Sequence, residues 1–150
     1  MKTDLLTRHA KSFYWASYFL DTKIYTKSCM LYNFCRSLDD IVDKKSELEK
    51  KKADFINFKN KFFERDTDNE TIKDMWTLIS NEKISLNVVK DLFDGVETDL
   101  SEKVKFKSKS ELITYSYRVA GTVGLMMAKI FKIKSKKALL GAINLGIAMQ

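Results

Sequence analysis

The sequence predicts an all-α protein that forms a single helical domain. Its 150 residues include no proline and only five glycines, so few positions interrupt a helix. Apolar residues recur every three or four positions in one segment after another, which is the spacing of a helix face. Apart from short stretches, no segment has the alternation of a half-buried strand. The composition, 45% hydrophobic and 31% charged, is that of a globular chain, and the length suits one domain.

The first two predicted helices lie in the N-terminal third of the chain. Residues 4–20 place apolar side chains at helical spacing on one side, and residues 21–27 form a polar break. A second helix is expected over about 26–43. This second helix carries the most unusual pattern of charges in the chain.

Three capping boxes mark the starts of later helices. The segments SELE at 46–49, TDNE at 67–70 and SKSE at 108–111 each place a hydroxyl side chain three residues before a glutamate. The two side chains of such a motif bind free backbone N–H groups at a helix start. The helices expected from them end near residues 65, 80 and 132.

Basic connectors separate the remaining helices. Ser85 is a candidate N-cap for a helix to about residue 100, and the connector 101–109 follows. A second connector, KIKSKK at 132–137, precedes the last helix, ALLGAINLGIAMQ. The apolar pattern of this helix is unfinished at Gln150 and has no stop signal, so we expect the natural protein to be longer.

The net charge of +7 comes mainly from lysine. A basic balance is typical of proteins that bind nucleic acid, a membrane surface or an anionic substrate, and a solvated lysine-rich surface has the same composition. No signal peptide is visible, and no apolar run reaches the ~20 residues of a membrane span. Cys29 and Cys35 are interpreted as small buried side chains in a reducing compartment. We expect a cytoplasmic protein that can associate with the inner face of the membrane.

A line of polar side chains runs along the second predicted helix, within LYNFCRSLDDIVD. Because each helical residue turns by about 100°, Tyr32, Arg36, Asp39 and Asp43 share an arc of roughly 60°. That arc lies beside the apolar face, at the edge of the core, where a helix contributes to a cavity. The apolar face consists of Leu31, Phe34, Cys35, Leu38, Ile41 and Val42.

Asp39 and Asp43 are the members of this line that indicate a metal. Two carboxylates four residues apart destabilise a helix by roughly 0.2–0.5 kcal/mol. Partial burial raises their pKa values unless a cation joins them, and Mg²⁺ typically binds one or two carboxylates together with substrate phosphate. Arg36 can pair with Asp39 or Asp40 or bind a phosphate. The alternative is an ordinary charged helix end in which Arg36 is the i,i+4 partner.

Small residues gather on one side of the long helix that is expected over about 110–132. Glycine within a helix costs about 1 kcal/mol relative to alanine, so two glycines there indicate the close approach of another helix or of a ligand. Taken by itself, the pattern favours close helix packing. Considered together with the second predicted helix, it also allows a long apolar slot with the carboxylates at its mouth. The small residues are Ala120, Gly121, Gly124 and Ala128, with Ala138, Ala142 and Gly146 in the last helix.

Four segments together resemble the squalene/phytoene synthases in order and spacing. They are SFYWAS, LYNFCRSLDDIVD, GVETDL and YSYRVAGTVGLMM. The resemblance covers essentially the whole chain and implies an isoprenoid-synthase-type helical bundle, of which residues 1–150 would be the truncated N-terminal portion of one domain. The last segment looks most like bacterial phytoene synthase.

The resemblance implies an Mg²⁺-dependent prenyltransferase, with Mn²⁺ as a possible substitute. Two geranylgeranyl diphosphates would condense head to head through a cyclopropyl diphosphate to phytoene. The expected partner is therefore a prenyl diphosphate and not nucleic acid, with peripheral membrane association. No NADPH is expected, and no glycine-rich dinucleotide motif is present.

The resemblance also assigns roles to individual residues. Asp39 and Asp43 would hold the metal on a diphosphate, Arg36 would contact a phosphate, and Tyr115 would lie near the reacting cation. Asp99 matches an acidic residue of the family. The other residues that we predict to bind substrate are Ser12, Phe13, Tyr32, Val119, Ala120 and Gln150.

The chain departs from the family pattern in one respect, and two alternative functions stay open. Gln150 matches the first residue of the family's second aspartate motif, so the rest of that motif is absent and the 150-residue chain is expected to be inactive by itself. Within the family, the alternative is a squalene or dehydrosqualene synthase that uses farnesyl diphosphate. Outside it, the alternative is a non-catalytic helical scaffold that binds anionic lipid through its basic connectors.

Overall fold

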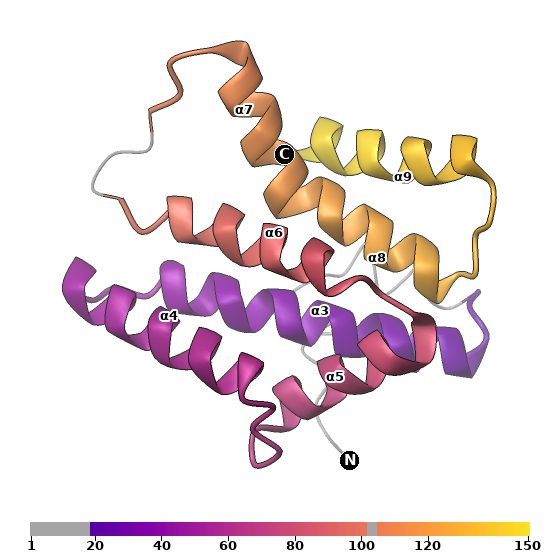
Figure 1. Ribbon diagram of the computed structural model, residues 1–150, viewed down its shortest axis with the longest axis horizontal. Coiled ribbons are helices and arrows are strands. Elements are labelled where there is room, and N and C mark those ends of the chain that lie inside the picture. The colour runs from indigo at the N-terminus through magenta and orange to yellow at the C-terminus, as the bar shows by residue number, and fades with distance from the viewer. Residues whose placement is uncertain (1–18, 102–104) are drawn as a thin grey trace.

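The computed structural model describes residues 19–101 and 105–150, and these residues fold into helices without any strand (Figure 1). This confirms the all-α prediction. No helix in the described ranges is long and apolar enough to cross a membrane. The predicted helix over 4–20 lies almost entirely outside the described residues. The elements are α3 (Thr22–Val42), α4 (Leu48–Phe63), α5 (Glu70–Glu82), α6 (Leu86–Thr98), α7 (Lys109–Ser116), the π-helix η1 (Tyr117–Gly121), α8 (Thr122–Ile130) and α9 (Lys136–Met149).

The core is built around α3, which packs against α4, α5, α6 and α8. Phe34 of α3 is fully buried, and its ring lies 5.3 Å from that of Phe62 and 5.9 Å from that of Phe93. Leu31 and Leu38, on the same side of the helix, are also buried. The apolar face predicted for this helix is therefore the face that enters the core.

Cys35 lies on this same face. Burial, with a smaller contribution from the negative charge of Asp39, raises the pKa of the Cys35 thiol to about 12. The thiol is therefore protonated and unreactive near neutral pH. This agrees with the structural role expected for Cys35.

The predicted polar break at 21–27 is wrong, because α3 begins at Thr22. Asp21 is its N-cap, and the Asp21 Oδ1 atom accepts a hydrogen bond from the Lys23 N–H at 2.8 Å. The helix thus begins four residues before the predicted start near residue 26. The polar residues that suggested a break form nearly the first two turns of the helix.

Two of the three predicted capping boxes do not cap. The Ser46 N–H donates to the Lys44 carbonyl at 2.8 Å, so Ser46 belongs to the turn after α3, and α4 begins after Glu47 without a side-chain cap. At α5 the cap is Asn69, whose Oδ1 accepts from the Ile72 N–H at 3.1 Å. The N-cap therefore lies one residue after Ser46 at α4 and two residues after Thr67 at α5.

The third capping box is confirmed at the start of α7. The Ser108 Oγ atom accepts a hydrogen bond from the Glu111 N–H at 3.1 Å. The Glu111 carboxylate reaches back and accepts from the Lys107 N–H at 2.7 Å. The two side chains thus satisfy backbone donors on both sides of the helix start.

The long helix predicted over 110–132 is continuous in space but changes its winding at η1. The Thr122 N–H donates to the Tyr117 carbonyl, five residues earlier, so one extra residue is inserted into the helix. Such π turns are frequent at functional sites. This one lies within the segment YRVAG, between α7 and α8.

Close helix packing accounts for most of the small residues. A Cβ atom on Gly124 would collide with the Ala142 carbonyl oxygen of α9, and one on Gly146 would collide with the Ala120 carbonyl oxygen of η1. A Cβ atom on Gly95 of α6 would lie 2.7 Å from the Arg118 Cβ. The glycines therefore let α9 and α6 approach this helix closely on two sides.

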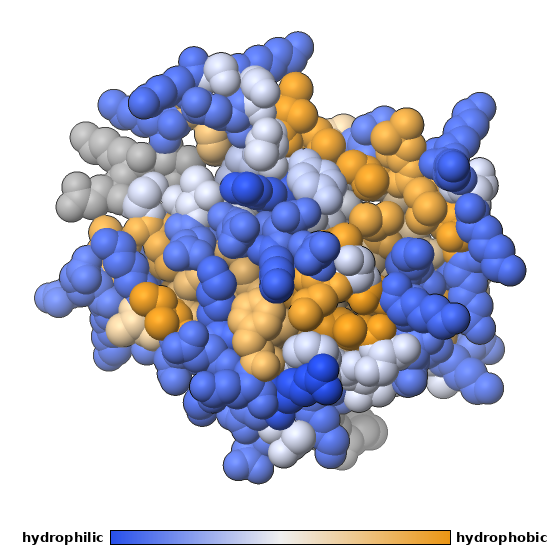
Figure 2. Space-filling view, viewed as in Figure 1, coloured by the Kyte–Doolittle hydropathy of each residue, from blue (hydrophilic) through white to orange (hydrophobic). Residues whose placement is uncertain are grey.

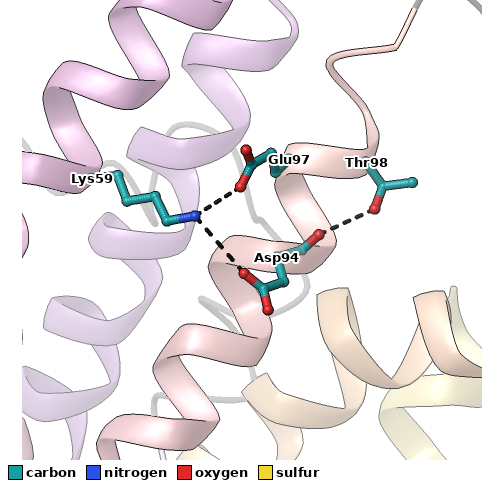
Figure 3. A network of polar contacts seen from close by, with 4 residues as sticks. All are labelled: Lys59, Asp94, Glu97 and Thr98. Carbon is teal, nitrogen blue, oxygen red and sulfur yellow. Dashed lines mark hydrogen bonds and ion pairs between the residues drawn. The ribbon is translucent and has the colours of Figure 1, made fainter.

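A polar network ties α4 to α6 on the side of α6 away from η1 (Figure 3). Lys59 Nζ lies 2.7 Å from a Glu97 carboxylate oxygen and 3.8 Å from one of Asp94. The Thr98 hydroxyl donates to the Asp94 carbonyl at 3.1 Å. These ion pairs are partly exposed and contribute less than about 1 kcal/mol each. Asp91 and Asp99 at other positions of this segment instead accept hydrogen bonds from Tyr117 and Tyr115.

Candidate functional site

The acidic line of α3 ends at its C-terminus. Asp39 lies on the last turn, and Asp43 is the C-cap residue, whose N–H donates to the Asp39 carbonyl at 2.7 Å. Burial raises the pKa of the Asp39 carboxyl, and the negative charge of Asp43 raises it further. Arg36 lowers this pKa, whereas Asp40 and Asp99 raise it. The local field at Asp39 therefore opposes its negative charge and favours a cation.

Asp99 brings a third carboxylate to this end of the bundle from α6. It is the C-cap residue of α6, and its Oδ1 atom accepts a hydrogen bond from the Tyr115 hydroxyl at 2.8 Å. Burial raises the pKa of Asp99, the Tyr115 hydrogen bond lowers it, and Asp43 raises it. Burial and Asp99 raise the pKa of Tyr115 well above its ordinary value, so the phenol stays neutral.

The electrostatic coupling thus joins α3, α6 and α7. Asp39 and Asp43 are neighbours on α3, Asp99 acts on Asp39, and Asp39 acts on Tyr115. The sequence places these residues up to 76 positions apart (115 − 39). The fold has brought together three of the residues predicted for the metal and the reacting cation, and it adds Asp99.

A pocket of about 400 Å³ lies next to Tyr115, between the end of α6 and the outer side of α7. Lys105 and Arg118 give it positive charge, and the Phe106 ring packs on the Tyr115 ring with 5.0 Å between centroids. Sequence reasoning missed Lys105 and Phe106, because nothing in the sequence shows that the connector folds back onto α7. Glu111 also lines the pocket, so a pocket with two cationic side chains and one carboxylate lies beside Tyr115.

A second tyrosine–aspartate hydrogen bond was also missed. The Tyr117 hydroxyl donates to Asp91 Oδ2 at 3.1 Å. Tyr117 is the first residue of η1, and Asp91 lies two turns before Asp99 on α6. The signal that could have found it is the pair of tyrosines in YSYRVAG together with Asp91 and Asp99, which lie about two helical turns apart in DLFDGVETD. Together the two bonds fix α7 and η1 against α6.

The other predicted residues lie in different places. Tyr32 is half-buried on α3, two turns before Asp39. The Val119 side chain packs close to Gly95 of α6, and the Ala120 carbonyl packs against Gly146 of α9. Gln150 is the exposed C-cap of α9, whereas Ser12 and Phe13 fall outside the described residues. Substrate binding by these residues stays a prediction.

Arg36 forms one of the two interactions that the sequence left open, the ion pair with Asp40, and phosphate binding by Arg36 stays a prediction. Its Nη2 atom pairs with Asp40 at 2.7 Å, which is the i,i+4 ion pair of an ordinary charged helix. Its Nε atom is buried and has no hydrogen-bond partner in the protein. A guanidinium carries five N–H donors, so this ion pair leaves donors for a second anion.

The donor set suits Mg²⁺ bound jointly with a phosphate. In the described part of the chain, no three Asp, Glu, His or Cys side chains converge to hold a metal by themselves. Mg²⁺ does not require such a cage, since it commonly binds one or two carboxylates and completes its shell with water and substrate phosphate. Asp39 and Asp43, with the raised pKa of Asp39, fit this requirement.

Comparison with known proteins identifies the family. The profile described as "Squalene/phytoene synthase" matches residues 6–150. The chain belongs to the squalene/phytoene synthase family. This confirms the resemblance that the four segments indicated.

Individual members of the family are distant in sequence. The chain is 25% identical to the phytoene synthase of Pseudescherichia vulneris, matching over 99% of its own length and 52% of the relative. It is 26% identical to the 15-cis-phytoene synthase of Pantoea ananas, with 94% of this chain and 49% of the relative covered. The chain thus spans about half the length of these relatives.

A solved structure shows the same fold. The crystal structure of a dehydrosqualene synthase in complex with ligand superposes with a TM-score of 0.72 at 23% sequence identity. The match covers 97% of this chain and 51% of that one. The helical arrangement in Figure 1 is therefore the isoprenoid-synthase bundle of the family.

The Tyr115→Phe variant is expected to raise the pKa of Asp99 further, because the hydrogen bond from the phenol now lowers it. Carboxyl ¹³C chemical shifts measured by NMR across a pH titration report this value directly. Tyr117→Phe is the matched control: it removes the bond to Asp91 and leaves the Asp99 titration in place. An Asp99 pKa that stays constant or falls in Tyr115→Phe would contradict the assignment.

Proposed function

We propose that the chain contributes one half of the active site of a prenyltransferase that condenses two geranylgeranyl diphosphates head to head to phytoene. The observation that carries this proposal is the convergence of Asp39, Asp43, Asp99 and Tyr115 from three helices at one end of the bundle. Family membership supplies the reaction class. The curated relatives quoted above, both phytoene synthases, favour the C20 substrate.

Asp39 and Asp43 hold the diphosphate end of the substrate through Mg²⁺ in this proposal. The metal, when bound, neutralises the diphosphate and helps it to leave. The carboxylates gain from the same contact, because a cation offsets the burial and the repulsion by Asp43 that together raise the pKa of Asp39. The free donors of Arg36 bind a phosphate oxygen beside the metal.

Tyr115 acts on the allylic cation that diphosphate departure leaves. Its hydroxyl is committed to Asp99, so the orientation of the ring is fixed. The raised pKa keeps the phenol neutral, which prevents a phenolate from capturing the cation as a nucleophile. A neutral aromatic ring stabilises a nearby cation through its quadrupole.

Farnesyl diphosphate is the alternative substrate, and the structural relative named as a dehydrosqualene synthase is the observation that favours it. Both substrates present the same diphosphate to Asp39 and Asp43 and differ only in the length of the apolar chain. The choice of the C20 substrate rests on the curated relatives. Labelled C15 and C20 diphosphates separate the two by product analysis.

The proposed setting is the inner membrane surface, where prenyl substrates of this length partition. In the described part of the connector before α7, Lys105 and Lys107 are exposed, and the lysines before α9 are exposed as well. Phe106 and Phe131 lie beside them and are partly exposed. Lysines next to aromatic side chains suit an anionic bilayer surface.

The purified 150-residue chain tests the proposal. We expect it to bind geranylgeranyl diphosphate only when Mg²⁺ or Mn²⁺ is present, as measured by isothermal titration calorimetry, and to form no product. Liposome binding by an Asp39→Ala, Asp43→Ala double variant is the control for the scaffold alternative, because lipid contact through the connectors needs neither carboxylate. Diphosphate binding that is independent of metal, or that survives the double variant, would overturn the proposal.

A further inference from the structure

A second pocket, with a volume of about 370 Å³, lies at the turn between α4 and α5. Arg65 and Thr67 belong to the turn, and the rest of the lining comes from one side of α5. Because α4 has 16 residues and spans about 24 Å, the pocket and the carboxylate-bearing end of α3 lie at opposite ends of α4 (Figure 1). The lining residues on α5 are Lys73, Trp76, Thr77, Ser80 and Asn81.

Trp76 forms a fixed wall of this pocket. Its Nε1–H group donates to the Phe62 carbonyl at 2.7 Å, and its ring stacks on the Phe62 ring with 5.2 Å between centroids. The guanidinium carbon of Arg65 lies 4.2 Å from the centre of the Trp76 ring. A cation–π contact of this kind holds the flat face of a guanidinium. The orientation of Arg65 is therefore set before any ligand binds.

The N–H groups of Arg65 remain for a ligand. Among residues 19–101 and 105–150, no carboxylate forms an ion pair with its guanidinium. The contact with Trp76 uses the face of the guanidinium, whereas its donors lie along the edge. The next residue, Asp66, is directed elsewhere: its carboxylate lies 3.6 Å from Lys61 Nζ and accepts a hydrogen bond from the Asp68 N–H at 3.0 Å.

The lining of the pocket is positively charged and polar. Lys73 adds a second cation, and no Asp or Glu side chain belongs to the lining in the described part of the chain. Figure 2 shows a mainly hydrophilic surface around the α4–α5 turn. Thr67, Ser80 and Asn81 supply further groups that can donate hydrogen bonds. The pocket thus suits an anion, and Trp76 alone gives it too little apolar wall for a hydrocarbon chain.

A phosphate group fits this lining better than a carboxylate does. The guanidinium of Arg65 can bind two oxygens of either anion. Lys73 and the hydroxyl groups then remain for the third oxygen and the second charge, which only a phosphate monoester carries. Contacts of exposed charges are weak, so we expect a dissociation constant on the order of 1 mM. In a titration with a micromolar prenyl diphosphate, the pocket is therefore hardly occupied.

We propose that the pocket formed by Arg65, Lys73 and Trp76 binds the terminal phosphate of a hydrophilic phosphate monoester or of a lipid headgroup. Both sources present the same chemical group to the same side chains. The inference rests on the pocket and not on the proposed catalysis. Its test therefore contains EDTA and no divalent metal.

Titration of the ¹⁵N-labelled chain with glycerol phosphate tests the soluble source, with the Trp76 indole N–H signal in NMR spectra as the readout. We expect a saturable shift. Arg65→Gln should weaken binding at least about tenfold, because it removes the charged fork, and Lys73→Gln about two- to fivefold. Lys137→Gln is the matched control, since it removes the same charge from the exposed start of α9 and should leave binding unchanged.

Vesicle flotation tests the lipid source. Phosphatidate vesicles present the terminal phosphate, and phosphatidylcholine vesicles are the control without it. Binding to phosphatidate alone that Arg65→Gln abolishes would assign the pocket to a lipid headgroup. A response to glycerol phosphate that Arg65→Gln weakens would assign it to a soluble phosphate monoester.

Three results would overturn the phosphate site. A chain that binds neither glycerol phosphate nor phosphatidate has no such site. Binding that tolerates both Arg65→Gln and Lys73→Gln uses another surface, and binding that Lys137→Gln weakens equally reflects only the net charge of the chain. Thermal unfolding checks that each variant folds. Because the Lys73 side chain is exposed, Lys73→Gln decides the question even if loss of the Arg65–Trp76 contact unfolds Arg65→Gln.

Discussion

Replacing Asp39 by asparagine is expected to abolish Mg²⁺-dependent binding of geranylgeranyl diphosphate and, at the same time, to stabilise the chain without metal. Asp39 is one of the two carboxylates that are proposed to bind the metal. Loss of a residue that only supports a metal ligand lowers metal affinity by about 10–100-fold. We therefore expect loss of the ligand itself to lower the affinity for the diphosphate in the presence of Mg²⁺ by at least about 100-fold. Titration calorimetry with and without Mg²⁺ measures this.

The gain in stability follows from the raised pKa of Asp39. A raised pKa means that the folded state binds the Asp39 proton more tightly than the unfolded state does. This proton therefore stabilises the fold fully below the ordinary carboxyl pKa, and the stabilisation is lost as the pH rises through the raised pKa of Asp39. Asparagine carries no charge at any pH and avoids this loss. At neutral pH the relief of the Asp39–Asp43 repulsion amounts to about 0.2–0.5 kcal/mol.

Urea unfolding of the two proteins between pH 4 and 7 without Mg²⁺ checks the sign. The stability difference in favour of Asp39→Asn should grow as the pH rises. Asp94→Asn is the matched control: it removes an exposed carboxylate on the far side of α6 and should leave diphosphate binding unchanged. An Asp39→Asn protein that is less stable at pH 7, or that still binds the diphosphate, would rule out the metal clamp.

Alanine substitutions at two glycines should have opposite effects on stability. Gly124→Ala places a methyl group on the Ala142 carbonyl of α9, a backbone atom that cannot rotate away. Forcing extra volume into a packed contact costs about 1–3 kcal/mol, which exceeds the gain of about 0.8–1 kcal/mol in helix propensity. Among the described residues, Gly141→Ala meets nothing within 4 Å, so the variant keeps only the propensity gain.

Thermal unfolding followed by circular dichroism compares the two variants. For a chain of this length each kcal/mol shifts the melting temperature by about 2–4 °C, so Gly124→Ala should melt below the parent and Gly141→Ala above it. The same ordering should appear in urea midpoints. If both variants rise together, α9 does not pack on α8 as described.

The sequence predicted the elements whose signals are local. The buried face of α3 follows from the turn per residue, and the fold places Phe34 and Leu38 in the core as that periodicity requires. The capping box at Ser108 was also readable, because donor and acceptor lie within four residues. The pattern at Ser46 failed, since the turn that follows α3 holds its backbone N–H.

The candidate site was predictable only in part, because its members come from separate helices. Asp39 and Asp43 lie one turn apart, so their repulsion can be read directly. The hydrogen bond from Tyr115 to Asp99 spans sixteen residues and depends on how α6 and α7 cross. The contact of Phe106 with Tyr115 depends on a connector that shows no pattern at all.

The sequence by itself determined that the described part of this protein is helical, which face of α3 is apolar, and that Asp39 and Asp43 repel each other at the end of α3. These properties arise from neighbours within one or two turns. Only the tertiary structure decided that Asp99 and Tyr115 join them, and that Gly124 and Gly141 differ. Two glycines in similar helices look alike in sequence, and the difference is that a second helix touches one and leaves the other open.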